Sequence, residues 1–494
     1  MTCVSLARQV ALSAAVLFAG CALSANAAFA DTGCPAGQGR TYEVGPPPRL
    51  QRLADVPWGT LGPGDRVLVY WRPEPYREQI LVSAVGTAAQ PVRICGVPGP
   101  QGQLPIITGQ DARSIRALGF PYPPTQERGV LVVTLREGQL WGTKPRYIVL
   151  DGLDLRGAHP GNFFTDQTGK RRRFSTSAAA LFVERGEHIV IRGCALADSA
   201  NGLFVASGDS EEVISRDILV EANHIYGNGV ANSFYQHNAY TEAVGIVYQQ
   251  NRFGQLRFGA GGNALKDRSA GTVIRYNWID GGAHLLDLVE PEDSRKITGV
   301  DPRFRRTYVY GNVLMNGPLD GFSVVHYGGD NGNATLYRKG TLFFFNNTVI
   351  IRGDEKTRWG TAIFRLETSD ETADVRNNIV FRQGSTHLLL VDGPGRLRLG
   401  TNWVSDGFAQ RLRPEPGMVP VTGLERLVVG RDSPFVDGDR GDLRVRPGSD
   451  AARPGDALAP DVAAEFLPGQ VYVPHQKVRA IAAGKGRTTL GALE

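Results

Sequence analysis

Two cationic side chains, Lys266 and Arg268, lie two positions apart in a short segment near the middle of the chain. The segment is expected to be a β-strand, and side chains two positions apart on a strand project from the same face. The two charges would therefore lie side by side and could bind an anionic group such as a carboxylate. Burial next to a second cation would also lower the pKa of Lys266 towards neutrality, which makes it a candidate general base.

Similar short strands occur before and after this one along the chain. They can be aligned so that the apolar positions point inwards, namely Leu286, Leu288, Val325, Phe364 and Leu366. One outward column then contains Tyr240, Lys266, Asp287, His326 and Arg365, and a second contains Glu242, Arg268 and Glu367. In this alignment Asp267 faces inwards or lies in a bend. A shift of one residue would invert every side chain, so the alignment is a prediction about register.

A face of this composition suits the β-elimination of a uronic acid polymer, because that reaction needs cations more than it needs paired acids. Arg268 would neutralise the substrate carboxylate and so make the neighbouring proton more acidic. Lys266 is one candidate for the base that removes this proton, and His237 and His326 are others because histidine titrates near neutral pH. Tyr240 would protonate the leaving oxygen. The other residues expected to bind substrate are Arg365, Asp287, Glu242 and Asn263.

Other functions remain open at this point. Hydrolysis requires two carboxylates roughly 5 to 9.5 Å apart. The available acids are Asp287, Glu290, Glu292 and Asp293, with Asp267 and Asp330 nearby. Asp287 and Glu290 would face opposite sides of a continuous strand, so they are less well placed than the cations. An epimerase and a non-catalytic polysaccharide-binding solenoid are the remaining alternatives. A calcium ion bound by Asp287 and Glu290 is a further expectation, with no other cofactor.

A repeated corner pattern, which runs from residue 147 to about 404, indicates how these strands are organised. An apolar residue, two variable residues, a corner residue, one more residue and a second apolar residue recur in that order. The corners are Leu153, Cys194, Asn223, Asn251, Asn277, Asn312, Asn347, Asn378 and Asn402. From Cys194 onwards they are 24 to 35 residues apart, a period typical of a solenoid. Asparagine tolerates a left-handed backbone and can bond to its equivalent one turn away, so stacked corners would form a ladder.

This spacing predicts an all-β chain that folds as a single parallel β-helix, in which each coil contacts only its neighbours. An all-β sandwich with accidental spacing is the alternative. We expect residues 31–404 to form the β-helix, with the Pro- and Gly-rich residues 31–57 as an N-terminal cap. Residues 405–494 lose the pattern and are expected to be an irregular tail over the open end, where unpaired strand edges would favour aggregation. A monomer is expected.

The first thirty residues have the features of a signal peptide. Arg8 supplies a positive charge, residues 10–25 are apolar, and Ala28-Phe-Ala30 is a small-x-small cleavage site before Asp31. We therefore expect residues 1–30 to be removed and the protein to be exported to the periplasm or the extracellular space. A lipid anchor at Cys21 is the less favoured alternative.

The composition of the remaining chain limits its partners and its cysteine chemistry. The formal net charge of +5 favours an acidic partner only weakly, and no nucleic-acid partner is expected. The basic run Lys170-Arg-Arg-Arg173 is interpreted as a solvated loop in preference to a polyanion site. No run of eighteen apolar residues follows the signal segment, so no membrane span is expected. An oxidising compartment permits a Cys34–Cys95 disulfide, whereas Cys194 lies at a corner and should be buried.

Residues from about 60 to 400 resemble the pectate-lyase-like right-handed parallel β-helix superfamily. The segments His237-Asn-Ala-Tyr240, Gly262-Asn-Ala-Leu-Lys-Asp-Arg-Ser269 and Leu286-Asp-Leu-Val-Glu290 resemble bacterial exported proteins described as polysaccharide-degrading enzymes. The resemblance implies a right-handed solenoid that acts on an acidic polysaccharide. Its alginate and chondroitin lyases use Lys and Arg together with Ca²⁺, but from different coils, whereas Lys266 and Arg268 share one strand. The superfamily also contains hydrolases and epimerases, so its fold is compatible with several reactions.

Overall fold

The computed structural model describes residues 34–35, 37–316, 322–353, 360–411, 418–460, 462, 466, 468–473, 476–481 and 489–494. The expected signal segment, which includes Cys21, lies outside the described residues. All the secondary structure belongs to the unit Ala36–Glu494. No helix among the described residues has the length and apolar character needed to span a bilayer.

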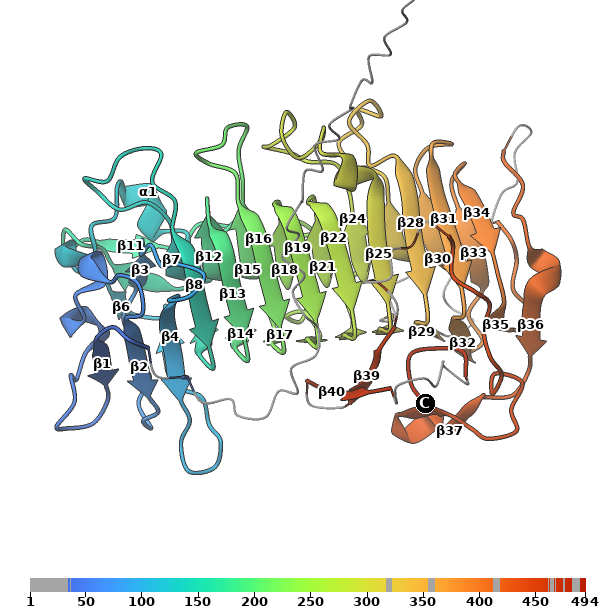
Figure 1. Ribbon diagram of the computed structural model, residues 1–494, viewed down its shortest axis with the longest axis horizontal. Helices are drawn as coiled ribbons and strands as arrows, with labels where there is room; N and C mark the ends of the chain where they lie inside the picture. Colours follow the sequence, from blue (N-terminus) through green and yellow to red (C-terminus); the bar gives the residue numbers. More distant parts are fainter. Residues whose placement is uncertain are drawn as a thin grey trace, which may run out of the picture. The chain divides into compact units, whose positions relative to one another are not determined.

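Three long parallel sheets make up this unit, and Figure 1 shows their strands side by side. Sheet 1 contains β1 (Thr41–Val44), β2 (Arg66–Tyr70), β4 (Val92–Val97), β8 (Arg146–Asp151), β13 (Glu187–Arg192), β16 (Arg216–Glu221), β19 (Val244–Gln249), β22 (Ala270–Arg275), β25 (Arg306–Tyr310), β28 (Gly340–Phe345), β31 (Glu371–Arg376) and β34 (Arg396–Leu399). Sheet 2 contains β5 (Ile106–Thr108), β9 (Asp154–Arg156), β14 (Ala195–Ala197), β17 (His224–Tyr226), β20 (Arg252–Phe253), β23 (Trp278–Asp280), β26 (Val313–Met315), β29 (Thr348–Gly353), β32 (Ile379–Gly384), β35 (Asn402–Ser405) and β36 (Leu427–Gly430). Sheet 3 contains β3 (Ile80–Val82), β7 (Gly129–Val133), β12 (Ala179–Glu184), β15 (Asn201–Ala206), β18 (Ala239–Thr241), β21 (Leu265–Asp267), β24 (Leu286–Leu288), β27 (Ser323–Tyr327), β30 (Thr361–Leu366) and β33 (Leu388–Asp392).

From β3 to β35 the chain visits the three long sheets in a fixed order, from sheet 3 to sheet 1 to sheet 2 and back to sheet 3, once in each coil. This arrangement is a parallel β-helix, as the corner spacing predicts. Helical structure in the described residues is confined to α1 (Pro123–Gln126) and to short 3₁₀ segments at Leu53–Asp55, Trp58–Thr60, Arg116–Leu118, Pro302–Arg305, Leu424–Arg426 and Gly438–Arg440. The N-terminal residues 41–60 begin sheet 1 with β1 and bury Leu53, Val56 and Trp58 in the core.

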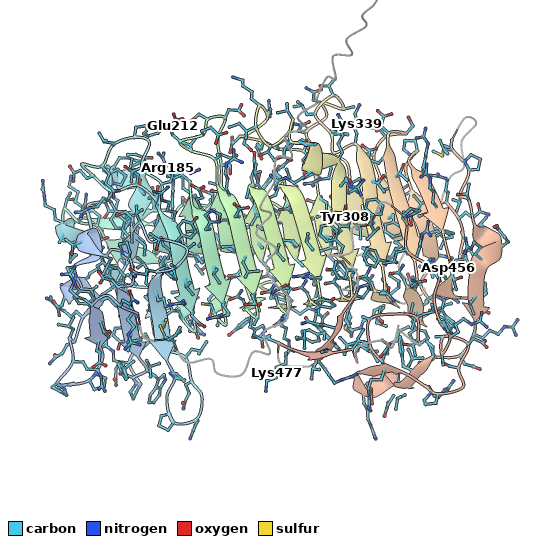
Figure 2. All side chains as sticks on the ribbon, in the orientation of Figure 1. Arg185, Glu212, Tyr308, Lys339, Asp456 and Lys477 are labelled. Atoms are coloured by element: carbon cyan, nitrogen blue, oxygen red, sulfur yellow. The ribbon has the colours of Figure 1, made fainter. Side chains whose placement is uncertain are left out.

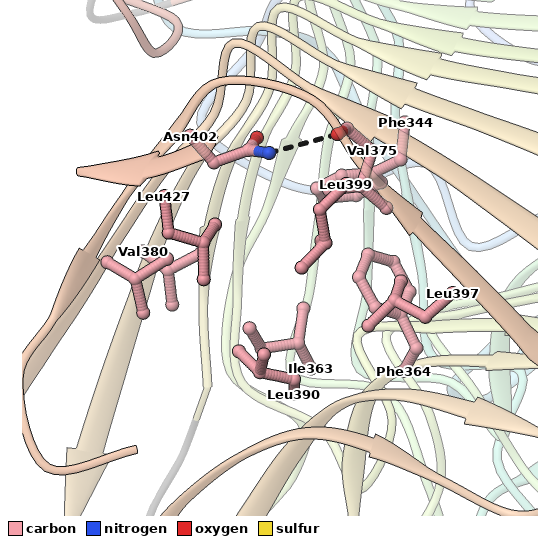
Figure 3. A pocket seen from close by; sticks show the side chains of 11 residues that line it. Phe344, Ile363, Phe364, Val375, Val380, Leu390, Leu397, Leu399, Asn402 and Leu427 are labelled. Atoms are coloured by element: carbon pink, nitrogen blue, oxygen red, sulfur yellow. Dashed lines mark hydrogen bonds between the residues drawn. The ribbon is translucent and has the colours of Figure 1, made fainter. Parts of the chain in front are cut away.

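The asparagine corners form the predicted ladder between sheets 1 and 2. Each corner amide donates to the side-chain oxygen of the next corner, as in the Asn251–Asn277 contact of 2.9 Å and the Asn312–Asn347 contact of 3.0 Å. The left-handed residue is the one before the corner, for example Gln250 with a φ of 61°, so the asparagine itself supplies the hydrogen bonds. At the last corner the Asn402 amide donates to the Val375 carbonyl at 2.9 Å (Figure 3).

Apolar side chains from all three sheets fill the interior of the coils. In sheet 3, Leu286, Val325 and Phe364 occupy equivalent positions on neighbouring strands and are buried. Figure 3 shows this apolar interior in the final coils. Cys194 is buried and free, whereas Cys34 and Cys95 are disulfide-bonded. The oxidised pair matches the sequence prediction and is compatible with export.

The described part of the C-terminal tail first extends the stack and then lies along its outside. Strand β36 adds to sheet 2 beyond residue 404. It is followed by two antiparallel hairpins, formed by β37 (Phe435–Asp437) with β38 (Asp442–Val445) and by β39 (Gln470–Val473) with β40 (Lys477–Ala480). Phe466 stacks on Tyr308 of sheet 1 with ring centroids 3.9 Å apart; Tyr308 is labelled in Figure 2. The described part of the tail therefore covers the outer faces of sheets 1 and 2.

Candidate functional site

Sheet 3 carries the outward column that the sequence predicts. Tyr240 is in register with Lys266, Lys266 with Asp287, Asp287 with His326, and His326 with Arg365. The inward apolar residues specify this register, because a slip by one position would expose all of them. The column continues past Tyr240 as a stack of aromatic rings, with centroids 4.7 Å apart for Phe204–Tyr240 and 4.9 Å apart for Phe182–Phe204.

Asp267 is the predicted exception, and it does point into the core. It accepts hydrogen bonds from the hydroxyls of Thr241 at 2.8 Å and Thr272 at 2.7 Å. Its counterion is Arg338, whose guanidinium lies 3.5 Å away and is fully buried. Arg338 could not be predicted from the sequence, because this residue follows a long turn after β27 and belongs to no repeated position.

Lys266 lies between two carboxylates. Its ammonium donates to Asp287 at 2.6 Å and also to Asp330. Burial alone would lower the pKa of Lys266, but the two acids outweigh burial and the neighbouring Arg268, so its pKa is raised. The expectation of a lowered pKa was therefore wrong, because it counted the adjacent cation without the acids. Lys266 is a fixed positive charge at neutral pH and not a free base.

Asp287 and His326 form the next part of the network. Asp287 accepts from His326 Nδ1 at 2.7 Å and from the Asn263 amide at 2.6 Å, in addition to Lys266. The His326 Nε2 contacts Glu367 at 2.9 Å. Burial alone would lower the pKa of His326, but its two carboxylate partners raise it to about 9. His326 is thus an imidazolium near neutral pH with both nitrogens occupied, which removes it from the candidate bases.

Arg268 lies on the second column and connects the network to a tyrosine. Its Nε donates to the Tyr240 hydroxyl at 2.8 Å, and its Nη2 lies 3.2 Å from Asp330 and 3.4 Å from Glu292. The Tyr240 hydroxyl in turn donates to Glu292 at 2.6 Å. Burial raises the pKa of Tyr240, although Arg268 opposes this effect. The phenol therefore keeps its proton at neutral pH and can act as a proton donor.

Two buried glutamates hold the loops that supply these acids. Glu242 accepts backbone N–H groups of Asp293 at 3.1 Å and Ser294 at 2.7 Å, which fixes the loop carrying Glu292. Glu290 accepts the N–H groups of Asp330 at 3.1 Å and Asn331 at 2.7 Å. Burial raises the pKa of Glu242, although these hydrogen bonds oppose the shift. The carboxylates of both residues are bonded to backbone N–H groups, and they position the loops that carry the solvent-facing acids.

His237 is a neutral neighbour of the cluster. Its Nδ1 accepts the backbone N–H of Asn263 at 2.8 Å, which leaves the proton on Nε2. Burial, with a smaller contribution from Lys266, lowers the pKa of His237 to about 3. Its ring stacks against that of Tyr240 at a centroid distance of 5.7 Å. His237 therefore packs against Tyr240 as an uncharged imidazole.

The most exposed charged groups of this site are Glu292, Asp330 and Arg365. Their side chains are 53%, 35% and 46% exposed. Arg365 is paired with Glu367. From the sequence, Glu292 and Asp330 were expected only as acids available for hydrolysis. The signal for Asp330 was weak but present, because a Gly-, Asp- and Asn-rich turn follows β27 directly.

The expected calcium ligands do not fit that role. Both oxygens of Asp287 are bonded to Lys266, Asn263 or His326, and those of Glu290 are bonded to backbone N–H groups. Calcium needs six to eight oxygen ligands that are free to face it. No group of three or more His, Cys, Asp or Glu side chains in the part of the chain that the structure describes could hold a metal ion.

The comparisons with known proteins concern the fold. No protein-family model and no curated protein matches the chain. A solved pectate lyase is 12% identical, covers 94% of this chain and 98% of its own, and has a TM-score of 0.46. A rhamnogalacturonan lyase is 14% identical, covering 72% of this chain and 85% of its own with a TM-score of 0.42. An alginate lyase from Paenibacillus sp. str. FPU-7 is 14% identical, with an alignment that covers 72% of this chain and 92% of the lyase and a TM-score of 0.37.

Proposed function

We propose that the protein is an exported enzyme that cleaves an acidic, uronate-containing polysaccharide by β-elimination at the outer face of sheet 3. The observation that carries the proposal is the environment of the Tyr240 hydroxyl. It accepts a hydrogen bond from Arg268 at 2.8 Å and donates one to Glu292 at 2.6 Å, beside solvent. A phenol between a fixed cation and an accessible carboxylate can exchange protons in both directions.

Substrate binding would begin at Arg268. The proton on the carbon next to a uronate carboxylate is weakly acidic, so the carboxylate charge must be neutralised before that proton can be removed. The Nη2 of Arg268 now contacts only Asp330 and Glu292 among the acids open to solvent. An incoming carboxylate would replace one of these contacts and accept a charge-assisted hydrogen bond. Lys266 and His326 keep their own acid partners and stabilise the surface beneath.

The proton steps balance within the Tyr240–Glu292 pair. Glu292 removes the proton next to the substrate carboxylate, and Tyr240 gives its proton to the leaving glycosidic oxygen. The C–H and C–O bonds break, and a carbon–carbon double bond forms between the two carbons. The proton on Glu292 then returns to Tyr240 along their 2.6 Å hydrogen bond, and the enzyme regains its initial state.

Ultraviolet absorbance tests this proposal, because elimination creates a double bond conjugated to the carboxylate. The mature protein would be incubated with alginate, polygalacturonate and glycosaminoglycans. Absorbance should rise with one of these polymers. Tyr240→Phe should lower the rate by about 10² to 10⁴-fold, the range for losing an acid–base group. Tyr226→Phe, on neighbouring sheet 2, is the matched control and should keep the wild-type rate. An unchanged rate in Tyr240→Phe would refute the assignment.

Hydrolysis is the second candidate, and one observation favours it. Glu292 and Asp330 are both solvent-accessible carboxylates, and both lie within 3.4 Å of the same Arg268 nitrogen. Paired carboxylates at close range are the groups that hydrolyse glycosidic bonds. New reducing ends without absorbance, lost in Glu292→Gln and Asp330→Asn, would support this reaction. Polymer binding with neither product would support an epimerase or a non-catalytic role.

A further inference from the structure

A small three-stranded sheet beside the main stack presents an arginine-rich face. Its central strand β10 (Phe163–Thr165) pairs with β6 (Ala112–Arg113) and with β11 (Arg171–Arg173). Thr165 is in register with both Arg113 and Arg171, and Phe163 is in register with Arg173. Residues in register, and residues two apart, share a face of a sheet. Arg113, Arg171 and Arg173 therefore project from one surface, around Phe163.

Phe163 holds two of these arginines in place without neutralising them. The guanidinium carbon of Arg171 lies 3.7 Å from the ring centroid, and that of Arg173 lies 4.6 Å from it. Contacts of this kind orient the side chains and leave their charge and N–H groups available. Both arginines are exposed, as is Arg113. We call Arg113, Arg171 and Arg173 the basic face.

The basic face differs from the candidate site in having no acid partner. Arg172, which points to the opposite side of β11, is bound to Asp166 at 2.8 Å and Glu127 at 3.6 Å. In the ranges that the structure describes, no residue of the basic face forms an ion pair, whereas each cation of the candidate site contacts a carboxylate. The run at 170–173 is thus part of an ordered hairpin, from which Arg171 and Arg173 project outwards, and not the solvated loop expected from its sequence.

The position of the hairpin relates it to the candidate site. It lies in the turn between β9 of sheet 2 and β12 of sheet 3, so it leads directly into the strand that carries Phe182. Phe182, Phe204 and Tyr240 are neighbours on the outward column. Parallel strands are about 4.8 Å apart, so the coil of the hairpin lies about 10 Å from Tyr240 along the stack. A polymer chain that follows the column from the site would reach this coil (Figure 1).

We propose that the basic face binds the carboxylate or sulfate groups of an acidic polysaccharide at sugar units remote from the bond that is cleaved. The identity of the polymer rests on the proposed function, but binding does not require cleavage. Arginine suits this role because its planar guanidinium can form two parallel hydrogen bonds with a carboxylate or sulfate. Held in a row, several unpaired cations also attract a polyanion over a distance that salt shortens.

Affinity electrophoresis of the full chain in gels that contain alginate or polygalacturonate tests the proposal. Arg171→Gln/Arg173→Gln should weaken binding by roughly tenfold at low salt and reduce its salt dependence. The control, Arg446→Gln/Arg453→Gln, removes the same charge from exposed arginines of the tail and should bind like wild type. Equal losses in both double variants, or no loss in the first, would overturn the proposal. Preferential binding of single-stranded nucleic acid would also overturn it.

The same variants separate this inference from the proposed function. If the wild type cleaves a polymer and Arg171→Gln/Arg173→Gln binds that polymer normally, the basic face is refuted and the lyase stands. If no polymer is cleaved but binding falls only in that variant, the basic face stands and the lyase is refuted. On oligosaccharides too short to reach the hairpin, the variant should keep the wild-type kcat/KM. A loss on these short substrates would show that the substitutions act on the catalytic site itself, which would contradict the proposal.

Discussion

The charge on His326 should make the folding stability of the protein depend on pH. Its imidazole is held between Asp287 at 2.7 Å and Glu367 at 2.9 Å, and these contacts raise its pKa to about 9. An unfolded chain would leave this residue with a pKa near 6.5. Because the folded pKa is the higher one, folding is favoured while the histidine is charged. The contribution is complete below about pH 6.5 and is lost as the pH rises through 9.

The size of this contribution follows from the interval between the two pKa values. An interval from 6.5 to about 9 corresponds to about 3 kcal/mol of unfolding free energy. The perturbation is His326→Gln, which cannot carry the charge. The free-energy difference between wild type and variant should then be about 3 kcal/mol larger at pH 6 than at pH 10. Nearby titrating groups such as Lys266 are present in both proteins, so their direct contributions largely cancel in this difference.

Urea unfolding followed by tryptophan fluorescence at pH 6, 8 and 10 would measure this difference. His387→Gln, at an exposed position, controls for the loss of an imidazole as such. A wild-type-to-variant difference that is the same at pH 6 and pH 10 would refute the reasoning, because it would mean that His326 is not a cation in the folded protein. A difference that grows with pH would show that the sign of the pKa shift is wrong.

The other predictions concern buried polar groups. Asn312→Ala should lower stability by about 3 to 5 kcal/mol in thermal unfolding, because it leaves several ladder groups unpaired; a loss below about 1 kcal/mol would contradict the ladder. Arg338→Met should cost about 3 to 5 kcal/mol by leaving Asp267 as an unpaired buried charge, and the double variant with Asp267→Asn should recover much of this loss. If the two changes simply add, the pair is not coupled. Glu242→Gln should lower kcat by releasing the loop of Glu292, with KM nearly unchanged; a change in KM alone would refute that positioning role.

The sequence could predict the column on sheet 3 because one physical constraint determines it. Side chains on a strand alternate, and Leu286, Val325 and Phe364 have to be buried. Once these residues are inside, alternation places Lys266 and Arg365 on the outer face of the sheet. The asparagine corners were predictable for a similar reason. Every coil turns at the same place, and the buried backbone groups of that turn need a hydrogen-bond partner, which the asparagine side chain supplies.

The electrostatics of the site could not be predicted in this way. The pKa of Lys266 depends on Asp330, which lies 64 residues later on an irregular turn. That turn is held by hydrogen bonds to Glu290, which depend on the three-dimensional course of the loop and on no repeated pattern. The path of the tail is a similar case, because Phe466, which stacks on Tyr308, belongs to no repeated position of the sequence.

The tail along sheet 1 changes how the stack should unfold. A solenoid in which each coil contacts only its neighbours behaves as a one-dimensional array and can fray from either end. Here the Gly469 N–H donates to Tyr276, 193 residues earlier, and the Gln476 amide donates to the Ala222 carbonyl, 254 residues earlier. The last residues of the chain are thereby tied to coils in its middle. Loss of the final coils would release contacts on much earlier ones, so the tail makes distant coils cooperative and protects an otherwise modular array from partial opening.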